Sequence, residues 1–458
     1  MADILPFIGT RYNSQLIGNL NKVLAPPYDV ISPDMQDELH ARHANNVVRL
    51  ILGKDEQGDD TFTNKYTRAA NTLRTWRSDG MLIEDNKPSI YLYEQEFKLP
   101  TGEIKRRAGF FALVKLEDYS SGGIKAHEHT FEGPKADRLK LMHSTNSNLS
   151  PILVIYHDKE QMLQRQLDEN MREKPWEEFK DDDGVIHKLW VSQKKEFIMS
   201  LRDWMKSQKL FIADGHHRYE SALNYRNERR EETGKCDRKQ PFDYMMMFCT
   251  SAEQDGLVIM PTHRVLTRQF MTQVSLAEAV GELKESFDFS EGKINISRAG
   301  EKEGRAIQEK VEKMGRKRPS FAMLLGSGNI MCMSLKKGVN PAELIDDDEL
   351  ASQTKQLDVS ILHHYIINQV FVGNPEFELD DDECYYVRDI KRIFDLLRGK
   401  KASLAFIMNA TPMEQVLKVV SAGIKMPHKS TCFYPKLISG LVIRIIDLDT
   451  DKPKALKH

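Results

Sequence analysis

The segment FIADGHHRYESALNYRNERRE (211–231) places an acid, a glycine, two imidazoles and a guanidinium between a buried strand and a helix. Free backbone N–H groups at the start of a helix attract anions, and the helix dipole adds to that attraction. A glycine lets a ligand approach the backbone closely, and an arginine can form paired hydrogen bonds with phosphate. The segment therefore predicts a phosphate or nucleotide site formed by Asp214, Gly215, His216, His217 and Arg218.

Other roles stay open for the same residues. The imidazoles of His216 and His217 could bind a metal or transfer a proton, and Asp214 could hold Mg²⁺ or orient a histidine. The simplest alternative is a capped helix in which Asp214 is the N-cap and the histidines lie at the edge of the core. Because short motifs often match by chance, the case for a site depends on the other polar clusters of the chain.

A second polar cluster, KAHEHTFEGPKADR (125–138), is dense in groups that take part in phosphoryl chemistry. His127 and His129 are two residues apart, so on a strand they would share a face and could bind one metal. The sequence identifies no third ligand, and a solvated loop would have a similar composition. The candidate site residues of this cluster are His127, Glu128, His129, Lys135 and Arg138.

Two further motifs flank this central region. LAPPYDVIS (24–32) places Tyr28 and Asp29 after two prolines, which fix an extended bend that suits either a pocket wall or a structural turn. MPHKSTCFYPK (426–436) is an ordered polar loop or a solvated connection. As an ordered loop it would complete a pocket through Lys429, Thr431 and Lys436.

Alternating strands and helices must position these motifs. Residues 89–118 alternate around Pro-Thr-Gly and predict a hairpin, and DYMMMFCTS (243–251) predicts a buried strand. NNVVRLILG (45–53) also predicts a strand, and YESALNYRNERREET predicts a helix ended by Gly234. We therefore expect an α/β (α+β) fold, with a mixed α/β region over 1–265 and a second, smaller α/β domain over 266–458 that carries the MPHKST motif.

Composition and charge exclude several classes of protein. The chain has 458 residues, with 66 basic and 68 acidic side chains and a formal net charge of −2. This balance gives no general attraction to nucleic acid or to membranes. No apolar run could cross a bilayer and no signal peptide is visible, so we expect a cytoplasmic protein. Five cysteines without a CxxC pair are typical of reduced thiols and not of a four-cysteine zinc site.

Five ordered motifs resemble a conserved family of unknown function, number ten-fifteen among such domains: APPYDVIS, HEHTFEGPKADR, ADGHHRYESA, PTHR and MPHKSTCFYPK. ADGHHR is also similar to the signature of the ParB-like superfamily, which includes a partition protein, sulfiredoxin and a free-serine kinase. This resemblance implies a ParB-like N-terminal region in which Gly215, His216, His217 and Arg218 hold nucleotide phosphates and Asp214 lies beside a metal. Sulfiredoxin's cysteine has no counterpart here, which disfavours sulfinic acid repair.

The resemblance to the serine kinase implies a phosphotransferase that uses ATP or ADP with Mg²⁺ on a small hydroxyl-bearing metabolite. The kinase's catalytic carboxylate lies upstream of its motif, so Asp29 and Glu128 are both candidates for the base. Phosphoryl transfer depends on positioning and charge neutralisation, for which these residue types suffice. The proposed catalytic set is Asp29, Glu128, His129, Asp214 and His217, with Lys135, Arg138 and Arg218 binding the nucleotide and Asp214 and His127 binding the metal.

We favour an enzyme with a nucleotide and a small molecule as partners, and a homodimer stays open. One alternative is a nucleotide-binding regulatory protein without kinase activity. The charge balance and the lack of a clear basic helix–turn–helix disfavour DNA as its partner. The second alternative is a metal-dependent phosphohydrolase that uses His127, His129, Asp214, His216 and His217.

Overall fold

The computed structural model describes residues 2–235, 239–271, 275–347, 350–377, 379, 382–427 and 429–446. The chain divides into two compact units, which we call unit 1 (1–258 with 435–458) and unit 2 (259–434). The sequence predicted a boundary at residue 265 and a second domain that continues to residue 458. The structure differs at the C-terminal end, because the segment from Pro435 onward adds to unit 1.

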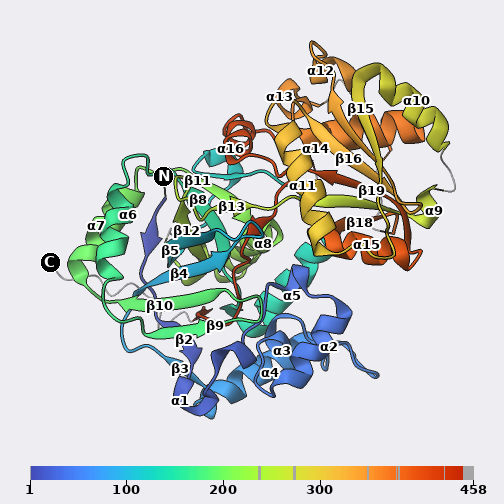
Figure 1. The fold of residues 1–458 in the computed structure, drawn as a ribbon. Coiled ribbons are helices and arrows are strands. Elements are labelled where there is room, and N and C mark those ends of the chain that lie inside the picture. The colour runs from blue at the N-terminus through green and yellow to red at the C-terminus, as the bar shows by residue number, and fades with distance from the viewer. Residues whose placement is uncertain are drawn as a thin grey trace. The chain divides into compact units, whose positions relative to one another are not determined.

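Unit 1 is built on a nine-stranded mixed sheet of order β6-β11-β8-β12-β5-β4-β10-β9, with β1 paired to β5 (Figure 1). Neighbouring strands are parallel at β6/β11 and at β8/β12 and antiparallel elsewhere. The predicted hairpin is β4 and β5, and the predicted buried strand is β12. The strands are β1 Ile4–Leu5, β4 Ile90–Lys98, β5 Ile104–Lys115, β6 Ile124–Ala126, β8 Ile152–Tyr156, β9 Glu177–Lys180, β10 Ile186–Ser192, β11 Leu210–Asp214 and β12 Tyr244–Ser251.

A second, four-stranded sheet of order β3-β2-β21-β7 joins distant parts of the chain. Its strands are β2 Gly9–Tyr12, β3 Leu82–Glu84, β7 Ser147–Asn148 and β21 Ile443–Ile445. Strand β21 lies between β2 and β7, with Arg444 opposite both Gly9 and Asn148. This pairing explains why the C-terminal segment belongs to unit 1 and not to the second domain that the sequence predicted.

Helices cover the large sheet and extend from it. Side chains of α6, α7 and α8 pack with the strands in one buried apolar cluster. Figure 1 shows α6 and α7 side by side, and contacts link α2, α3, α4, α5 and α8 in succession. The helices are α1 Ser14–Ile17, α2 Pro33–Arg42, α3 Val48–Ile51, α4 Lys65–Ser78, α5 Glu132–Thr145, α6 Met162–Asn170, α7 Lys195–Met205 and α8 His216–Thr233, with short 3₁₀ turns at Leu20–Lys22, Tyr28–Val30, Tyr119–Ser121 and Pro241–Asp243.

The predicted strand at 45–53 is wrong, because this run forms helix α3. The Asn46 side chain accepts a hydrogen bond from Val48 N (2.9 Å) and donates to the carbonyl of Lys22 (2.8 Å). Asn46 therefore starts the helix and anchors it to an earlier segment. An apolar run of this length carries no clear period, so its sequence alone fits a buried helix as well as a strand.

Unit 2 is a separate α/β unit around a six-stranded sheet of order β15-β17-β16-β19-β14-β18. The strands of this sheet are β14 His263–Thr267, β15 Phe287–Lys293, β16 Ser320–Leu325, β17 Asn329–Leu335, β18 Cys384–Val387 and β19 Ala402–Met408. The short strand β20 Phe433–Tyr434 lies outside this sheet, and β13 Val258–Ile259 lies at the boundary between the two units. Its helices are α9 Arg268–Met271, α10 Leu276–Ser286, α11 Glu301–Gly315, α12 Pro341–Leu344, α13 Ser352–Lys355, α14 Asp358–Ser360, α15 Ile390–Arg398 and α16 Met413–Ser421, with a π-helix at Ile361–Val372. The expected mixed α/β class is thus confirmed for both units.

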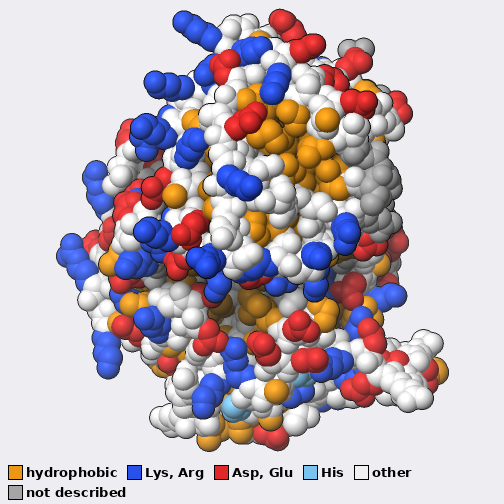
Figure 2. All heavy atoms as spheres, turned by 45° about the vertical axis from the view of Figure 1, so that its right-hand side comes forward, with side chains coloured by type: hydrophobic (Ala, Val, Ile, Leu, Met, Phe, Trp, Pro, Cys, Tyr) orange, Lys and Arg blue, Asp and Glu red, His pale blue; other side chains and the backbone are white. Residues whose placement is uncertain are grey.

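The surface and the cysteines agree with the composition. Figure 2 shows basic and acidic side chains interspersed over the face that it presents. In the described part of the chain, the four cysteines at 249, 332, 384 and 432 are buried and form no disulfide, while Cys236 lies outside the described residues. Among the described helices, none combines the length and the apolar character needed to cross a bilayer.

Candidate functional site

The two histidine-rich motifs meet because the strands that precede them are parallel neighbours. Strand β6 pairs with β11 so that Ala126 lies opposite Ile212. Parallel strands end at the same edge of a sheet, so the residues that follow β6 lie beside the end of β11. His127 Nδ1 is 2.9 Å from the carbonyl oxygen of Ile212, which joins the two motifs directly. The sequence could not show this meeting.

His127 lies inside the protein with a defined protonation state. Its side chain is 3% exposed, and burial lowers its pKa from the ordinary value to about 4. The ring is therefore neutral at physiological pH. Because a carbonyl oxygen only accepts hydrogen bonds, Nδ1 carries the proton and Nε2 keeps its lone pair. Such a ring can accept a hydrogen bond or bind a metal through Nε2.

His216 is the first residue of α8 and packs against His127. The two rings meet nearly at right angles, with their centroids 4.6 Å apart. His216 Nδ1 lies 3.4 Å from the Glu128 carboxylate, and the backbone N–H of His127 points toward His216 Nε2 at 3.4 Å. The Glu128 side chain is 25% exposed. The arrangement places one carboxylate within reach of solvent above two buried imidazoles.

These three side chains form a compact group of metal-binding type. Ligand atoms of His127, Glu128 and His216 all lie within 4.8 Å of one another. Two imidazoles and one carboxylate are a set that catalytic zinc sites use, with a further position left for water or substrate. The sequence had proposed His127 and Asp214 as ligands, or a wider set with His129, His216 and His217, and had not included Glu128 among the metal ligands. His129 is exposed, since β6 ends at Ala126 and the alternation of a strand does not continue to that residue.

Asp214 ends β11 and is bound by two cationic side chains. One carboxylate oxygen contacts the Lys436 ammonium, and the other accepts a hydrogen bond from Arg218 Nη2 at 2.7 Å. Burial alone would raise the pKa of this carboxyl, but Lys436 and Arg218 hold it well below its usual range. Both oxygens already contact cations, so we assign Asp214 a positioning role in place of the metal-ligand role expected from the sequence.

Arg107 adds a third cation to this buried region. Its side chain is fully buried, and it donates to the Gln95 side chain and to the Pro435 carbonyl (2.5 Å). Burial lowers the pKa of Arg107 to about 10, while the charge of Asp214 opposes that change. Arg107 was not predicted from the sequence, and Lys436 was predicted only as part of a loop that completes a pocket. The signal for Arg107 was a charged residue within an otherwise apolar strand.

Arg138 and Arg218 line one cleft but are also held by the protein. Arg218 donates to the Pro151 carbonyl as well as to Asp214. Arg138 donates to Asp137 and to the Ile51 carbonyl (2.6 Å), and its guanidinium lies 4.0 Å from the centre of the Tyr28 ring. Both side chains are almost completely buried. The cleft itself is described further below.

The other predicted site residues lie around this centre. His217 Nε2 accepts a hydrogen bond from the Phe131 backbone N–H at 3.0 Å. Lys135 contacts Glu132 (2.6 Å) and Glu220 (3.5 Å). Asp29 is exposed on the 3₁₀ turn Tyr28–Val30. Of the C-terminal set, Lys436 reaches Asp214, whereas Lys429 and Thr431 belong to unit 2. The ring of His428 lies outside the described residues.

Gly215 makes the turn from strand to helix and is the N-cap of α8, a role that one sequence hypothesis gave to Asp214. Its φ of +95° is one that other residues rarely adopt, and an added Cβ would lie 3.0 Å from the Arg218 guanidinium carbon. We expect Gly215→Ala to lower the free energy of unfolding by about 1–3 kcal/mol. Denaturant unfolding followed by tryptophan fluorescence measures this in unit 1, where all four tryptophans lie.

Gly234→Ala is the matched control, since Gly234 also has a positive φ (+63°) at the other end of α8, but no atom of the described residues lies within 4 Å of an added Cβ. This substitution should lower the free energy of unfolding by only about 1 kcal/mol. If Gly215→Ala and Gly234→Ala lower the free energy of unfolding equally, contact between the added Cβ and Arg218 contributes nothing to the loss.

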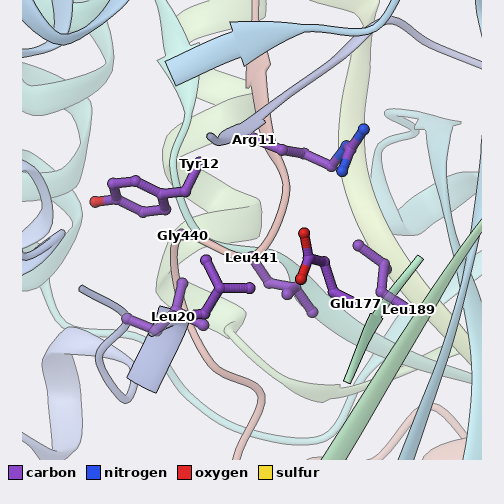
Figure 3. Close-up of a pocket in the computed structure, with 8 residues that line it drawn as sticks. Arg11, Tyr12, Leu20, Glu177, Leu189, Gly440 and Leu441 are labelled. Carbon is purple, nitrogen blue, oxygen red and sulfur yellow. The ribbon is translucent and has the colours of Figure 1, made fainter. Parts of the chain in front are cut away.

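A separate cleft in unit 1, of about 220 Å³, contains none of the predicted site residues, although Leu24 of the LAPPYDVIS motif lines it (Figure 3). Figure 3 shows Arg11, Tyr12 and Glu177 among its lining side chains. Arg11 is paired with Asp85 (Nε to Oδ2, 3.0 Å), and Tyr12 donates to the Asn45 carbonyl at 2.8 Å. These contacts tie together the small sheet and its neighbours, and we assign this cleft a structural role.

Solved structures resemble the chain at low sequence identity. Free serine kinase in complex with AMP is 14% identical and covers 68% of this chain and 84% of its own, with a TM-score of 0.31. A conserved hypothetical protein from Pyrococcus furiosus is 13% identical, with 71% and 94% covered and a TM-score of 0.32. SbnI with a C-terminal truncation, from Staphylococcus aureus, is 11% identical, with 71% and 86% covered and a TM-score of 0.29. No curated protein sequence matches the chain.

A sequence model of one family matches residues 4–360, which is more than half of the chain. The match includes the APPYDVIS, HEHTFEGPKADR, ADGHHRYESA and PTHR motifs and ends before MPHKSTCFYPK. It confirms the family expected from those motifs. The chain therefore belongs to the family described as Protein of unknown function (DUF1015).

Proposed function

We propose that unit 1 is a nucleotide-dependent phosphotransferase that moves a phosphoryl group from ATP or ADP to the hydroxyl group of a small metabolite. The observation that supports this most is the Glu128 carboxylate beside the amino end of α8, 3.4 Å from His216 Nδ1. A proton acceptor and an anion-binding helix end are parts that phosphoryl transfer uses. The nucleotide is proposed as donor because the DGHHR motif resembles that of the serine kinase.

Glu128 is the base that we propose, in preference to Asp29. Glu128 has both access to solvent and a buried imidazole beside it, whereas Asp29 lies on an exposed turn. The carboxylate of Glu128 can accept the proton of the acceptor hydroxyl, and His216 Nδ1 can orient that carboxylate. Backbone N–H groups in the first turn of α8 can hold phosphate oxygens. Asp214 keeps Arg218 and Lys436 in place behind that turn.

The donor atoms of the site fit some metals better than others. Mg²⁺ takes oxygen ligands, and the protein offers it only the Glu128 carboxylate among the three clustered side chains. Two imidazole nitrogens with one carboxylate suit Zn²⁺ or Mn²⁺ better. A divalent ion bound there would supply charge neutralisation next to the helix end. Magnesium would instead depend mainly on the phosphates of the nucleotide.

A metal-dependent phosphohydrolase is a second candidate, because His127, Glu128 and His216 match the donor set of hydrolytic zinc sites. In that case water would take the place of the acceptor hydroxyl. Both candidates use the same side chains and differ in the nucleophile. The decisive measurement is therefore the fate of the phosphoryl group.

The experiment incubates the purified chain with ATP or ADP and a set of small hydroxyl compounds, in EDTA or with added Mg²⁺, Mn²⁺ or Zn²⁺. Mass spectrometry then identifies the products. A phosphorylated acceptor supports the phosphotransferase. Nucleotide cleavage at a rate that acceptors do not change supports the hydrolase. If calorimetry detects no nucleotide binding and neither product forms with any metal, both proposals are wrong.

A further inference from the structure

A cleft of about 430 Å³ in unit 1 lies between α5, the first turn of α8 and strand β7. We call it the arginine cleft. That volume includes space open to solvent, so the cleft can enclose only a group of few heavy atoms. Its polar lining residues are Tyr28, Arg138, Ser147, Asn148, Ser150, Arg218 and Ser221.

Two of these lining residues carry buried polar atoms that have no hydrogen-bond partner among the residues that the structure describes. They are Ser147 Oγ and Asn148 Nδ2, on side chains that are 4% and 2% exposed. Buried polar groups are nearly always paired, because an unpaired one loses its hydrogen bonds to water and gains nothing in return. The two atoms belong to neighbouring residues that line one cleft, so a molecule bound in that cleft is the partner that we consider for them.

The hydrogen bonds of Asn148 fix which way its amide points. Its Oδ1 accepts from the backbone N–H of Met246 (3.1 Å) and from Arg444 Nη1 (3.2 Å). Both partners are donors, so the oxygen must occupy that side and the NH₂ group the other. The NH₂ group of Asn148 is therefore the end of the amide that lacks a partner among the described residues. The missing partner of this group is a hydrogen-bond acceptor.

Two guanidinium groups line the same cleft. Among the described residues, Arg218 uses two of its nitrogen atoms, toward Pro151 and Asp214. Arg138 contacts Asp137 and the Ile51 carbonyl, and Asp137 also accepts a hydrogen bond from the Tyr66 hydroxyl (2.7 Å). Each guanidinium has five N–H donors, so both retain donors beyond these contacts. Arginine pairs of this kind favour planar or tetrahedral oxyanions.

We propose that the arginine cleft binds a small metabolite through a carboxylate or phosphate group, which Arg138 and Arg218 hold and which Ser147 and Asn148 complete. Both groups are oxyanions, and their oxygen atoms accept from guanidinium, amide and hydroxyl donors alike. The site uses residues other than the His127, Glu128 and His216 group. Identifying this ligand with the phosphoryl acceptor rests on the proposed function, but binding itself does not.

The test is calorimetry on the full chain, without nucleotide or added metal, with inorganic phosphate and with glycerate as separate probes. We expect one of them to bind. Ser147→Ala should weaken that binding about tenfold, as expected for a lost hydrogen bond to a charged group. It should leave the thermal unfolding temperature unchanged or raised, because Ser147 Oγ has no hydrogen bond with any described residue that the variant would lose. Arg138→Lys replaces the planar guanidinium and its paired N–H donors by a compact ammonium group, and it should weaken binding further.

Ser192→Ala is the matched control, since Ser192 Oγ is also buried without a partner but its residue does not line the cleft. The dissociation constant of the Ser192→Ala variant for the probe that binds should equal that of the wild type. Binding of phosphate alone assigns a phosphate ligand, and binding of glycerate alone assigns a carboxylate ligand. If neither probe binds, or if Ser147→Ala binds as the wild type does, the proposal is wrong. Anion binding without phosphoryl transfer would instead contradict only the proposed function.

Discussion

Replacing Asp214 by alanine is expected to lower the free energy of unfolding by about 3–5 kcal/mol. The Asp214 carboxylate, 12% exposed, contacts Arg218 and Lys436, whose side chains are 6% and 17% exposed. Without the Asp214 carboxylate, the nearly buried cations of Arg218 and Lys436 would lose the negative charge that they share. Removing one partner of a buried ion pair costs far more than the pair contributes, because the remaining charge stays desolvated. Tryptophan fluorescence in denaturant measures this loss for unit 1.

The control for Asp214→Ala is Asp203→Ala, which removes the partner of Lys206 on the surface. Those side chains are 69% and 64% exposed, so their pair should contribute less than about 1 kcal/mol. Circular dichroism should show the same secondary structure for both variants at low denaturant. A loss for Asp214→Ala no larger than that for Asp203→Ala would contradict the role given to this carboxylate.

The same carboxylate should make stability depend on pH. Burial alone would raise the pKa of Asp214, but Lys436 and Arg218 lower it below the unfolded value of about 3.9. The unfolded chain therefore takes up a proton at a higher pH than the folded chain does. The stabilisation is complete above the unfolded pKa and is lost as pH falls toward the folded pKa. We expect the stability difference between wild type and Asp214→Ala to shrink from about pH 5 to pH 2. A constant difference would rule this cause out.

Glu128→Gln is expected to lower kcat for phosphoryl transfer by about 10²–10⁴, the range for loss of a general base. The amide keeps the size of the side chain but cannot take up a proton at neutral pH. Because Glu128 is partly exposed, its replacement should change the free energy of unfolding by less than about 1 kcal/mol. Rates are measured with a saturating acceptor, and nucleotide affinity is measured separately by calorimetry.

Glu132→Gln is the matched control on the same segment, since the Glu132 side chain is 91% exposed and contacts Lys135 at the surface. Its kcat should stay within about twofold of the wild type. If Glu128→Gln keeps wild-type kcat, Glu128 is not the base. If it abolishes nucleotide binding while kcat at saturation is retained, its role is in binding and not in proton transfer.

Local sequence patterns predicted the elements that carry the site. The apolar run before Asp214, the glycine at 215 and the helix that ends before Gly234 all lie where the sequence predicted them. Such features depend on a few neighbouring residues, because alternation, glycine turns and helix ends are local properties of the backbone. The family could also be predicted, because its motifs are contiguous in the sequence.

The composition of the centre could not be predicted in the same way. The sequence proposed Asp214 and His127 as metal ligands, whereas the structure groups His127 with Glu128 and His216. Two facts decide this grouping: β6 ends one residue before His127, and β6 is the parallel neighbour of β11. Strand pairing is a long-range property that no local spacing encodes.

The sequence by itself determined which residues can do chemistry and which strand and helix present the DGHHR motif. Only the tertiary structure decided that Asp214 is held by Lys436, which is 222 residues away in the chain. It also decided that Ser147 and Asn148 line one cleft with Arg138 and Arg218. The physical reason is that hydrogen bonds and ion pairs act over a few ångströms in space. Which distant segments come that close depends on how strands pair and how the C-terminal segment returns to unit 1.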